Sequence, residues 1–329
     1  MPLLRIENLA VTFQTYAGTI YAVNGISFDV NENETLVIVG ESGCGKSVTA
    51  HSIVRLLPGK KTRISEKSKI IFEGKNLLEF SEKEMEAIRG SEISMVFQDP
   101  LSYLNPTMTI GNQVMESIVI HENVSAKEAR RRAIKILELA QISNPEKRLK
   151  QYPYEFSGGM RQRVMIAIAL ACNPKILIAD EPTTALDVTI QAEILELIQK
   201  IQKETKTAVI LITHDLGIAA EVADRIQVMY AGEIIERGYA REIFKNHKHP
   251  YTKALLAAVP SVAQLKEKKL YAPDGSHPDM LEKPRGCSFA ERCNKCMKVC
   301  LERKPPEMSA GREHFARCWL LHPLAHNEC

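Results

Sequence analysis

The chain lacks the long apolar run that a membrane-spanning helix needs. Its longest uninterrupted apolar stretch is Val164 to Cys172, whereas a helix needs about 20 apolar residues to cross the hydrocarbon core of a bilayer. No basic-then-apolar signal segment opens the sequence. We therefore expect a soluble, cytosolic protein, and any role at a membrane would be peripheral and would depend on a partner.

An excess of charge of either sign is lacking too. The 43 Lys and Arg residues nearly balance the 40 Asp and Glu residues, for a net charge of +3. This argues against a strongly nucleic-acid-binding surface, although a local basic patch stays open. Hydrophobic residues make up 45% of the 329 positions, enough for a substantial core in one large domain or two smaller ones.

Cysteine is scarce in most of the chain and crowded at its end. Two cysteines, Cys44 and Cys172, lie in the main body. The other six fall in the last 43 positions and are Cys287, Cys293, Cys296, Cys300, Cys318 and Cys329. In a cytosolic chain such a cluster suggests bound metal rather than disulfides.

Four of these cysteines suit a Cys₄ site. Cys287, Cys293, Cys300 and Cys318 are separated by five, six and seventeen residues, which fits an iron–sulfur cluster and equally a zinc site. Cys296 adds a zinc-like Cys-x-x-Cys spacing with Cys293. The spacing leaves a cluster, zinc and no metal open, and we expect the terminal Cys329 to be disordered and not to be a ligand.

A glycine-rich loop lies between a predicted strand and a predicted helix. The strand is Thr35–Val39, and the helix runs from Val48 to Leu57 and stops at Pro58-Gly59. The loop residues between them are Gly40, Glu41, Ser42, Gly43, Cys44, Gly45, Lys46 and Ser47. This context predicts a phosphate-binding loop, whose backbone N–H groups and helix N-terminus surround phosphate oxygens. Lys46 would bind the β- and γ-phosphates, and the Ser47 hydroxyl would ligate Mg²⁺.

The segments around this loop predict an α/β fold. Residues 1–34 read as an antiparallel β-subdomain, with short strands at 3–6, 11–13, 20–23 and 26–30. Tyr16 or Tyr21 could stack there on a purine ring, or simply pack against the sheet. Residues 58–70 read as a solvated loop. Residues 226–236 read as a hairpin joined through Ala231-Gly232.

The middle of the chain alternates helices with buried strands, which predicts a parallel sheet covered on both faces. Residues 101–172 read as helical, and a capping box is expected within them at Ser125–Glu128. An earlier capping box at Ser81–Glu84 is expected to begin a short helix. Strands at 93–97, 176–179 and 208–212 end beside Gln98, Asp180-Glu181 and His214. Ligands bind at such strand ends in open α/β sheets.

Five motifs place this sequence beside a known family. Gln98, Ser157-Gly158-Gly159, Asp180-Glu181, Asp187 and His214 occur in the order and approximate spacing of an ATP-binding-cassette ATPase. The chain resembles that family over residues 3–250. The resemblance implies a P-loop fold with a RecA-like parallel sheet, a β-subdomain, and a helical subdomain at about 101–172. It gives an ATPase domain at 1–250 and a small cysteine-rich extension at 251–329.

The resemblance also implies roles for these residues. Asp180 would hold Mg²⁺ and Glu181 would act as general base or orient the attacking water. His214 would contact the γ-phosphate and that water, and Gln98 would link Mg²⁺ and water to a transmembrane partner.

Two further motifs would act across a dimer in this family. Ser157, Gly158 and Gly159 would contact the ATP held by a partner subunit, so that two ATP molecules are sandwiched head to tail. Asp187 would contact the partner subunit across the same dimer interface.

Three longer segments resemble one branch of this family. Residues 98–106, 157–163 and 249–256 are similar to segments of dipeptide and oligopeptide import ATPases. This implies a heterodimer with a second ATPase subunit, two permeases and an extracellular peptide-binding protein, at the cytoplasmic face of the membrane. It also implies a [4Fe–4S] cluster on the four tail cysteines. Nickel-chelate import, a soluble ATPase acting on nucleic acid, and a metal- or redox-sensing protein remain as alternatives.

Overall fold

The computed structural model describes residues 1–99, 103–184, 186–258, 275 and 278–326. Residues 100–102 of the segment after Gln98, and Cys329, lie outside these ranges. The chain folds into two compact units. Unit 1 comprises residues 1–3, 30–35 and 77–212, and unit 2 comprises residues 4–29, 36–76 and 213–329.

Unit 1 contains three parallel strands in the order β7-β8-β9, with Ile93 opposite Ile176 and Ile176 opposite Ala208. The strands are β7 (Ile93–Val96), β8 (Ile176–Asp180) and β9 (Ala208–Thr213). Every residue of β8 and β9 is buried. This is the pattern of a parallel sheet covered on both faces, and it confirms the two buried strands expected from the sequence.

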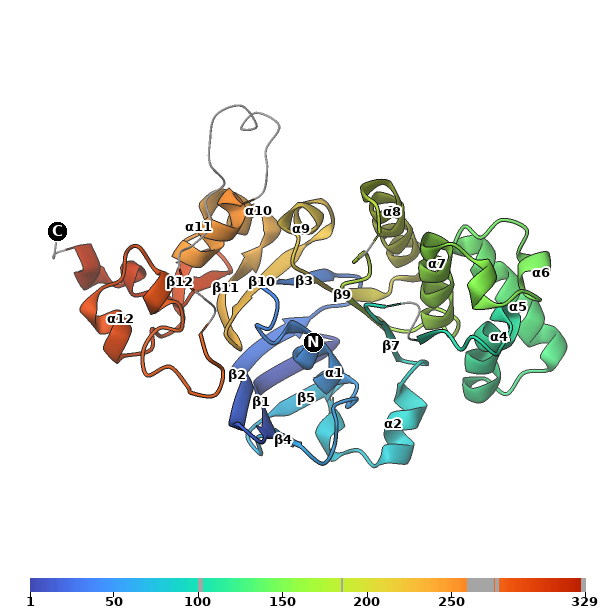
Figure 1. Cartoon of the computed structure of the whole chain (residues 1–329), viewed down its shortest axis with the longest axis horizontal. Coiled ribbons are helices and arrows are strands. Elements are labelled where there is room, and N and C mark those ends of the chain that lie inside the picture. Colours follow the sequence, from blue (N-terminus) through green and yellow to red (C-terminus); the bar gives the residue numbers. More distant parts are fainter. Residues whose placement is uncertain (100–102, 185, 259–274, 276–277, 327–329) are drawn as a thin grey trace. The chain divides into compact units, whose positions relative to one another are not determined.

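The helices of unit 1 are α2 (Glu82–Ile88), α4 (Ile110–His121), α5 (Ala126–Leu139), α6 (Pro145–Arg148), α7 (Gly158–Ala169) and α8 (Val188–Thr205). Helices α4, α5 and α7 pack on one another in Figure 1. The capping box before α2 is confirmed, because Ser81 Oγ accepts the Glu84 N–H at 3.3 Å and the Glu84 carboxylate accepts the Ser81 N–H at 2.7 Å. Two 3₁₀ turns also occur, at Leu77–Glu79 and Pro153–Glu155.

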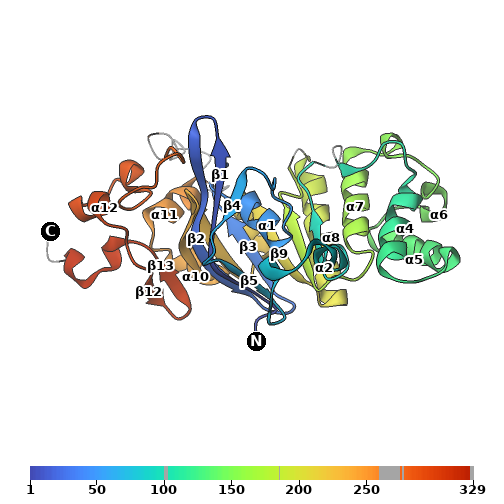
Figure 2. The same cartoon turned by 90° about the horizontal axis from the view of Figure 1, so that it is seen from below.

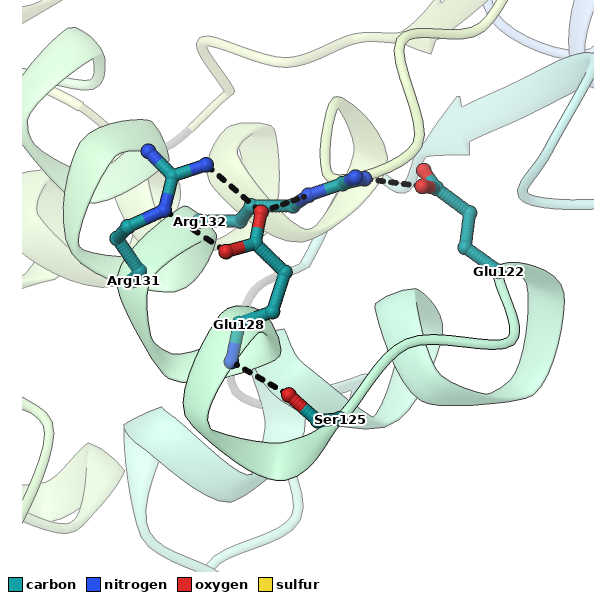
Figure 3. A network of polar contacts seen from close by, with 5 residues as sticks. All are labelled: Glu122, Ser125, Glu128, Arg131 and Arg132. Atoms are coloured by element: carbon teal, nitrogen blue, oxygen red, sulfur yellow. Dashed lines mark hydrogen bonds and ion pairs between the residues drawn. The ribbon is translucent and has the colours of Figure 1, made fainter.

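The second predicted capping box forms only in part. Ser125 Oγ accepts the Glu128 N–H at 3.3 Å, as expected. The Glu128 carboxylate instead accepts hydrogen bonds from Arg131 and Arg132, and Arg132 also pairs with Glu122 (Figure 3). Hydrogen bonds from the two arginines lower the pKa of Glu128 to about 2. Charged partners one turn away thus outcompete the backbone for this carboxylate.

Unit 2 begins with a long hairpin rather than four short strands. Strand β1 (Leu4–Thr15) and strand β2 (Gly18–Val30) run side by side (Figure 2). The prediction of short strands was wrong because Gly25, with a φ of 78°, lies within β2 and does not end it.

The same sheet contains β4 (Thr62–Ile64), β5 (Lys69–Phe72) and β6 (Lys75–Asn76). Its order is β2-β1-β5-β6, with β4 paired to β1. The expectation of a solvated loop over residues 58–70 was therefore wrong in part, because Val11 to Phe13 pair with residues 62–64. Polar side chains on an edge strand look like a loop when the sequence is read alone.

A second set of strands in unit 2 has the order β12-β13-β11-β10-β3. They are β3 (Thr35–Val39), β10 (Arg225–Tyr230), β11 (Glu233–Tyr239), β12 (Met308–Gly311) and β13 (His314–Ala316). Strands β10 and β3 are parallel, and β10 and β11 form the predicted antiparallel hairpin. Strand β13 pairs with β11, so the end of the chain continues the sheet that carries the glycine loop.

The helices of unit 2 are α1 (Lys46–Ile53), α9 (Leu216–Val222), α10 (Ala240–Asn246), α11 (Pro250–Ala257) and α12 (Lys298–Glu302). Helix α1 ends earlier than the predicted Leu57, because Arg55 has a φ of 52° that does not continue a helix. Short 3₁₀ turns lie at Ala290–Arg292, Trp319–Leu321 and Pro323–His326. None of the helices in the described ranges is long and apolar enough to cross a membrane.

A buried polar cluster joins β11 to the last strands of the chain. His314 Nε2 lies 2.8 Å from Glu236 Oε1, and both side chains are fully buried. The backbone N–H groups of Lys248 and His249 donate to the same carboxylate. Burial acts to raise the pKa of Glu236, but the hydrogen bonds from His314 and from these backbone groups outweigh it and lower that pKa. The carboxylate is therefore ionised and satisfied, as a buried charge must be.

We predict that the chain becomes less resistant to thermal unfolding as the pH falls from 7 to 5. Burial lowers the pKa of His249 from its ordinary 6.5 to about 4. Between these values the unfolded chain binds more protons than the folded chain. The contribution of His249 to the free energy of unfolding is therefore complete above pH 6.5. It is lost as the pH falls toward 4, by at most about 1.4 kcal/mol per pH unit.

The matched variant is His249→Asn. His249 Nδ1 accepts the Tyr251 N–H at 3.1 Å and caps α11, and asparagine can make the same cap without titrating. Thermal unfolding followed at pH 5, 6 and 7 should show a shallower pH dependence in this variant. An unchanged dependence would contradict the assignment to His249.

Candidate active site

The phosphate-binding loop requires glycine at positions where the backbone of other strands approaches it. A Cβ on Gly45, which has a φ of 103°, would lie 2.4 Å from the carbonyl oxygen of Ala22. A Cβ on Gly40 would lie 2.2 Å from the carbonyl oxygen of Met229. Gly45 is the N-cap of α1, so the loop leads directly into the positive end of that helix. Packing against neighbouring strands therefore fixes the loop at both of its ends.

The lysine of the loop is buried and held at its centre. Lys46 is 4% exposed. Its Nζ donates to the carbonyl oxygens of Gly40 and Glu41 at 2.8 and 3.0 Å. Burial raises the pKa of Cys44 although Lys46 acts to lower it, so this thiol is neutral. The loop thus carries a fixed positive charge beside its backbone N–H groups, which is what phosphate binding needs.

The predicted catalytic carboxylate lies at the end of β8 in unit 1. Asp180 is the last residue of β8 and is 3% exposed. Glu181 follows it with a φ of 45°. The Glu181 Oε2 atom accepts hydrogen bonds from Gln98 Nε2 at 3.1 Å and from Thr184 Oγ1 at 3.0 Å. The structure thus brings Gln98 and Glu181 together, and a strained backbone of this kind is typical of functional sites.

The Ser157-Gly158-Gly159 motif begins α7. Ser157 is the N-cap and accepts the Met160 N–H at 3.4 Å. A Cβ on Gly159 would lie 2.8 Å from Ile190 Cγ2 in α8, whereas one on Gly158 would make only an ordinary contact. Gly159 therefore allows the close packing of α7 on α8, in addition to the approach to phosphate inferred from the sequence. The exposed side of the motif is formed by Ser157 and Gly158.

Asp187 has a local role that sequence reasoning did not anticipate. Its Oδ1 accepts the Ile190 N–H at 3.0 Å and caps α8. Aspartate at an N-cap stabilises a helix by about 1 kcal/mol. The residue is exposed, so the cap leaves its outer side accessible to a second molecule.

The remaining nucleotide-binding candidates lie in unit 2. Tyr16 is fully exposed in the turn between β1 and β2, with Lys61 Nζ 5.8 Å from its ring, so it does not pack against the sheet. Tyr21 is half-buried beneath Lys283, at 4.8 Å. His214 follows β9 and is exposed. Tyr16 and His214 thus share their unit with the phosphate-binding loop.

The tail cysteines gather in one region without forming a finished metal site. Cys300 and Cys318 are buried and Cys287 and Cys293 are half-buried. Burial, together with Cys300, Cys318 and Cys293 nearby, raises the pKa of Cys287 to about 12. The more exposed Cys296 also lies near Cys293 and Cys300. Within the described residues, no three Cys, His, Asp or Glu side chains are arranged to hold a metal ion.

Sequence reasoning missed two residues that contact the phosphate-binding loop. The Tyr251 hydroxyl accepts the Glu41 N–H at 2.9 Å. Arg292 Nη1 donates to the Glu41 carboxylate at 2.8 Å. Both partners are more than 200 positions from the loop in sequence, and contacts of that range leave no periodic signal in the chain.

The loop, the strand-end carboxylates and the fold define a P-loop ATPase of the ATP-binding-cassette class. Residues 23–184 match the family described as ABC transporter, and residues 235–300 match the family described as the C-terminal region of oligopeptide/dipeptide transporters. The chain belongs to the ATPases of the oligopeptide/dipeptide branch of the ABC transporter family.

Similar proteins cover nearly the whole chain. It is 52% identical to the oligopeptide transport ATP-binding protein OppD of Bacillus subtilis, over 98% of this chain and 90% of that protein. It is also 52% identical to the dipeptide transport ATP-binding protein DppD of the same organism, over 96% and 94%. A solved dimer of the cassette MJ0796, bound to ADP and phosphate after hydrolysis, superposes with a TM-score of 0.65 at 30% identity. That match covers 72% of this chain and 99% of the cassette.

We predict that Gly45→Ala abolishes nucleotide binding, because the new Cβ collides with the Ala22 carbonyl and a φ of 103° disfavours any side chain. Gly59→Ala is the matched control, since a Cβ there meets nothing within 4 Å. Binding of a fluorescent ATP analogue measures both variants. The steric account is wrong if Gly45→Ala binds the analogue as tightly as Gly59→Ala.

Proposed function

We propose that this chain is the ATP-hydrolysing, energy-coupling subunit of an importer for dipeptides or oligopeptides. The observation that carries the proposal is the match of its C-terminal region to oligopeptide/dipeptide transporters, joined to 52% identity with two peptide-transport ATPases over nearly the whole length. We take residues 1–250 as the ATPase domain and 251–329 as the extension. Nickel-chelate import by the same family is the alternative that the transport test separates.

The proposed chemistry assigns each site residue a task. The backbone N–H groups of residues 40–47 and the Lys46 ammonium hold the phosphates of ATP. Ser47, Gln98 and Asp180 hold Mg²⁺, which neutralises charge on the β- and γ-phosphates. Tyr16 is free to stack on the adenine ring because it is fully exposed.

Hydrolysis itself falls to the strand-end residues. Glu181 accepts a proton from the attacking water, and His214 contacts the γ-phosphate and that water. The hydrogen bonds from Gln98 and Thr184 to Glu181 support this role, since they fix the direction in which the carboxylate points. A base held in this way needs no rearrangement before it takes the proton.

A second ATPase subunit completes each ATP site in this proposal. Ser157, Gly158 and Gly159 at the N-terminus of α7 face the ATP of the partner, and Asp187 crosses the same seam. The similar cassette structures are dimers, which supports this arrangement. Closing and reopening of the two ATPases would then move two permeases, supplied by an extracellular peptide-binding protein. The chain would work at the cytoplasmic face of the membrane, touching it only through the permeases and binding no nucleic acid.

The test is peptide uptake by the complete transporter carrying Glu181→Gln. We expect this variant to bind ATP but to hydrolyse it about 10²- to 10⁴-fold more slowly, because glutamine cannot accept the proton. Uptake should fall with it. Glu92→Gln is the control, since Glu92 pairs with Lys175 on the surface. If Glu181→Gln hydrolyses ATP at the wild-type rate, Glu181 is not the catalytic base. If the transporter takes up nickel chelates but not peptides, the proposal of a peptide substrate is wrong.

We propose further that Cys287, Cys293, Cys300 and Cys318 hold a [4Fe–4S] cluster. Their mutual proximity supports this, since each of Cys287 and Cys318 has its pKa raised by burial and then by the other thiols. The four thiols would have to lose their protons to bind iron, and the bound metal would itself stabilise the thiolates. The cluster would act as a structural staple for an extension of fewer than 80 residues. A zinc ion on the same set is the competing assignment.

Anaerobically purified protein should therefore absorb near ~400 nm and contain iron and sulfide. Cys300→Ser should remove this absorption, because it deletes one of the four ligands. Cys172→Ser should keep it, since that cysteine lies in unit 1. If the protein is colourless and contains one equivalent of zinc, the cluster assignment is wrong and the four cysteines bind zinc instead.

A further inference from the structure

The second residue of the phosphate-binding loop, Glu41, is held from three directions. Its N–H donates to the Tyr251 hydroxyl at 2.9 Å. Its carbonyl oxygen accepts from Lys46 Nζ at 3.0 Å. Its carboxylate accepts from Arg292 Nη1 at 2.8 Å. Two of these three partners come from the C-terminal part of the chain, so the extension reaches the loop that binds ATP.

Arg292 is well fixed in this position. Its side chain is 9% exposed. Its guanidinium lies 5.8 Å from the ring of Tyr230 and 5.9 Å from the ring of Phe289, at distances typical of cation–π contacts. Its Nη1 also donates to the Tyr230 hydroxyl at 3.3 Å. A planar guanidinium that is packed beside two rings loses little further freedom when it binds a carboxylate.

The charge on Glu41 explains why such a partner is needed. Glu41 is the only acidic residue among residues 40–47. A triphosphate entering the loop meets this carboxylate, and like charges at short range repel one another strongly where water is partly excluded. Arg292 neutralises the carboxylate and keeps it on the extension side of the loop.

We propose that Arg292 of the cysteine-bearing extension is a positioning residue for ATP binding, which acts through Glu41. Arg292 does not contact the nucleotide in this scheme. It holds the first turn of the loop in the shape that binds phosphate and removes the negative charge that opposes it. Because Cys293 is the next residue, the ion pair between Arg292 and Glu41 connects the cysteine region to the ATP site. The inference depends on ATP hydrolysis and not on the nature of the transported cargo.

The test compares Arg292→Gln with Arg292→Lys in the full-length chain. We expect Arg292→Gln to weaken binding of a fluorescent ATP analogue about tenfold, as loss of a partly buried charge pair does. In the assembled transporter it should raise the KM for ATP by a similar factor and leave kcat within about threefold, because no catalytic group is changed. Arg292→Lys keeps the charge and should keep most of the affinity.

A second variant separates positioning from a general loss of structure. Adding Glu41→Gln to Arg292→Gln removes the unpaired carboxylate and should restore most of the affinity. Lys304→Ala is the matched control. Lys304 forms an ion pair with Glu233 of β11, and none of its described hydrogen bonds or ion pairs reaches the loop. The proposal is overturned if Arg292→Gln binds the analogue normally, if Lys304→Ala weakens binding equally, or if the double variant shows no recovery.

Discussion

The proposed function depends on one interaction, the binding of ATP phosphates by backbone N–H groups at the start of α1. These groups can converge only because Gly40 and Gly45 let the loop pass against the carbonyl oxygens of Met229 and Ala22. Those carbonyls belong to β10 and β2, so both sheets of unit 2 shape the loop. Lys46 adds the charge that the N–H groups do not carry. In the proposed mechanism, Mg²⁺ binding and hydrolysis both require the phosphates to be held at this loop.

Features set by local chemistry could be predicted from the sequence. The buried strand Thr35–Val39, the cap at Ser81 and the position of Glu181 after a strand all follow from residues next to one another, and the structure confirms their placement. Features set by distant partners could not. Glu128 turns to Arg131 and Arg132 rather than to its cap, and residues 62–64 become a strand only because β1 lies beside them.

The C-terminal extension is part of the unit that carries the phosphate-binding loop. Strand β13 pairs with β11, and the buried contact between Glu236 and His314 fixes the two together. Sequence reading took residues 251–329 as a small cysteine-rich extension because the family resemblance implied one. Its core is supplied by the ATPase strands, which is a long-range property. Consequently the cysteine region and the loop are coupled through the fold and not only through the chain.

The most direct test of the central claim is amide hydrogen exchange in residues 40–53, measured with and without Mg-ATP. Bound phosphate should accept hydrogen bonds from the loop N–H groups, so exchange in this segment should slow markedly on ATP binding, while exchange in α5 of unit 1 should stay the same. If ATP binds but exchange in residues 40–53 does not change, phosphate is held elsewhere and the account is wrong.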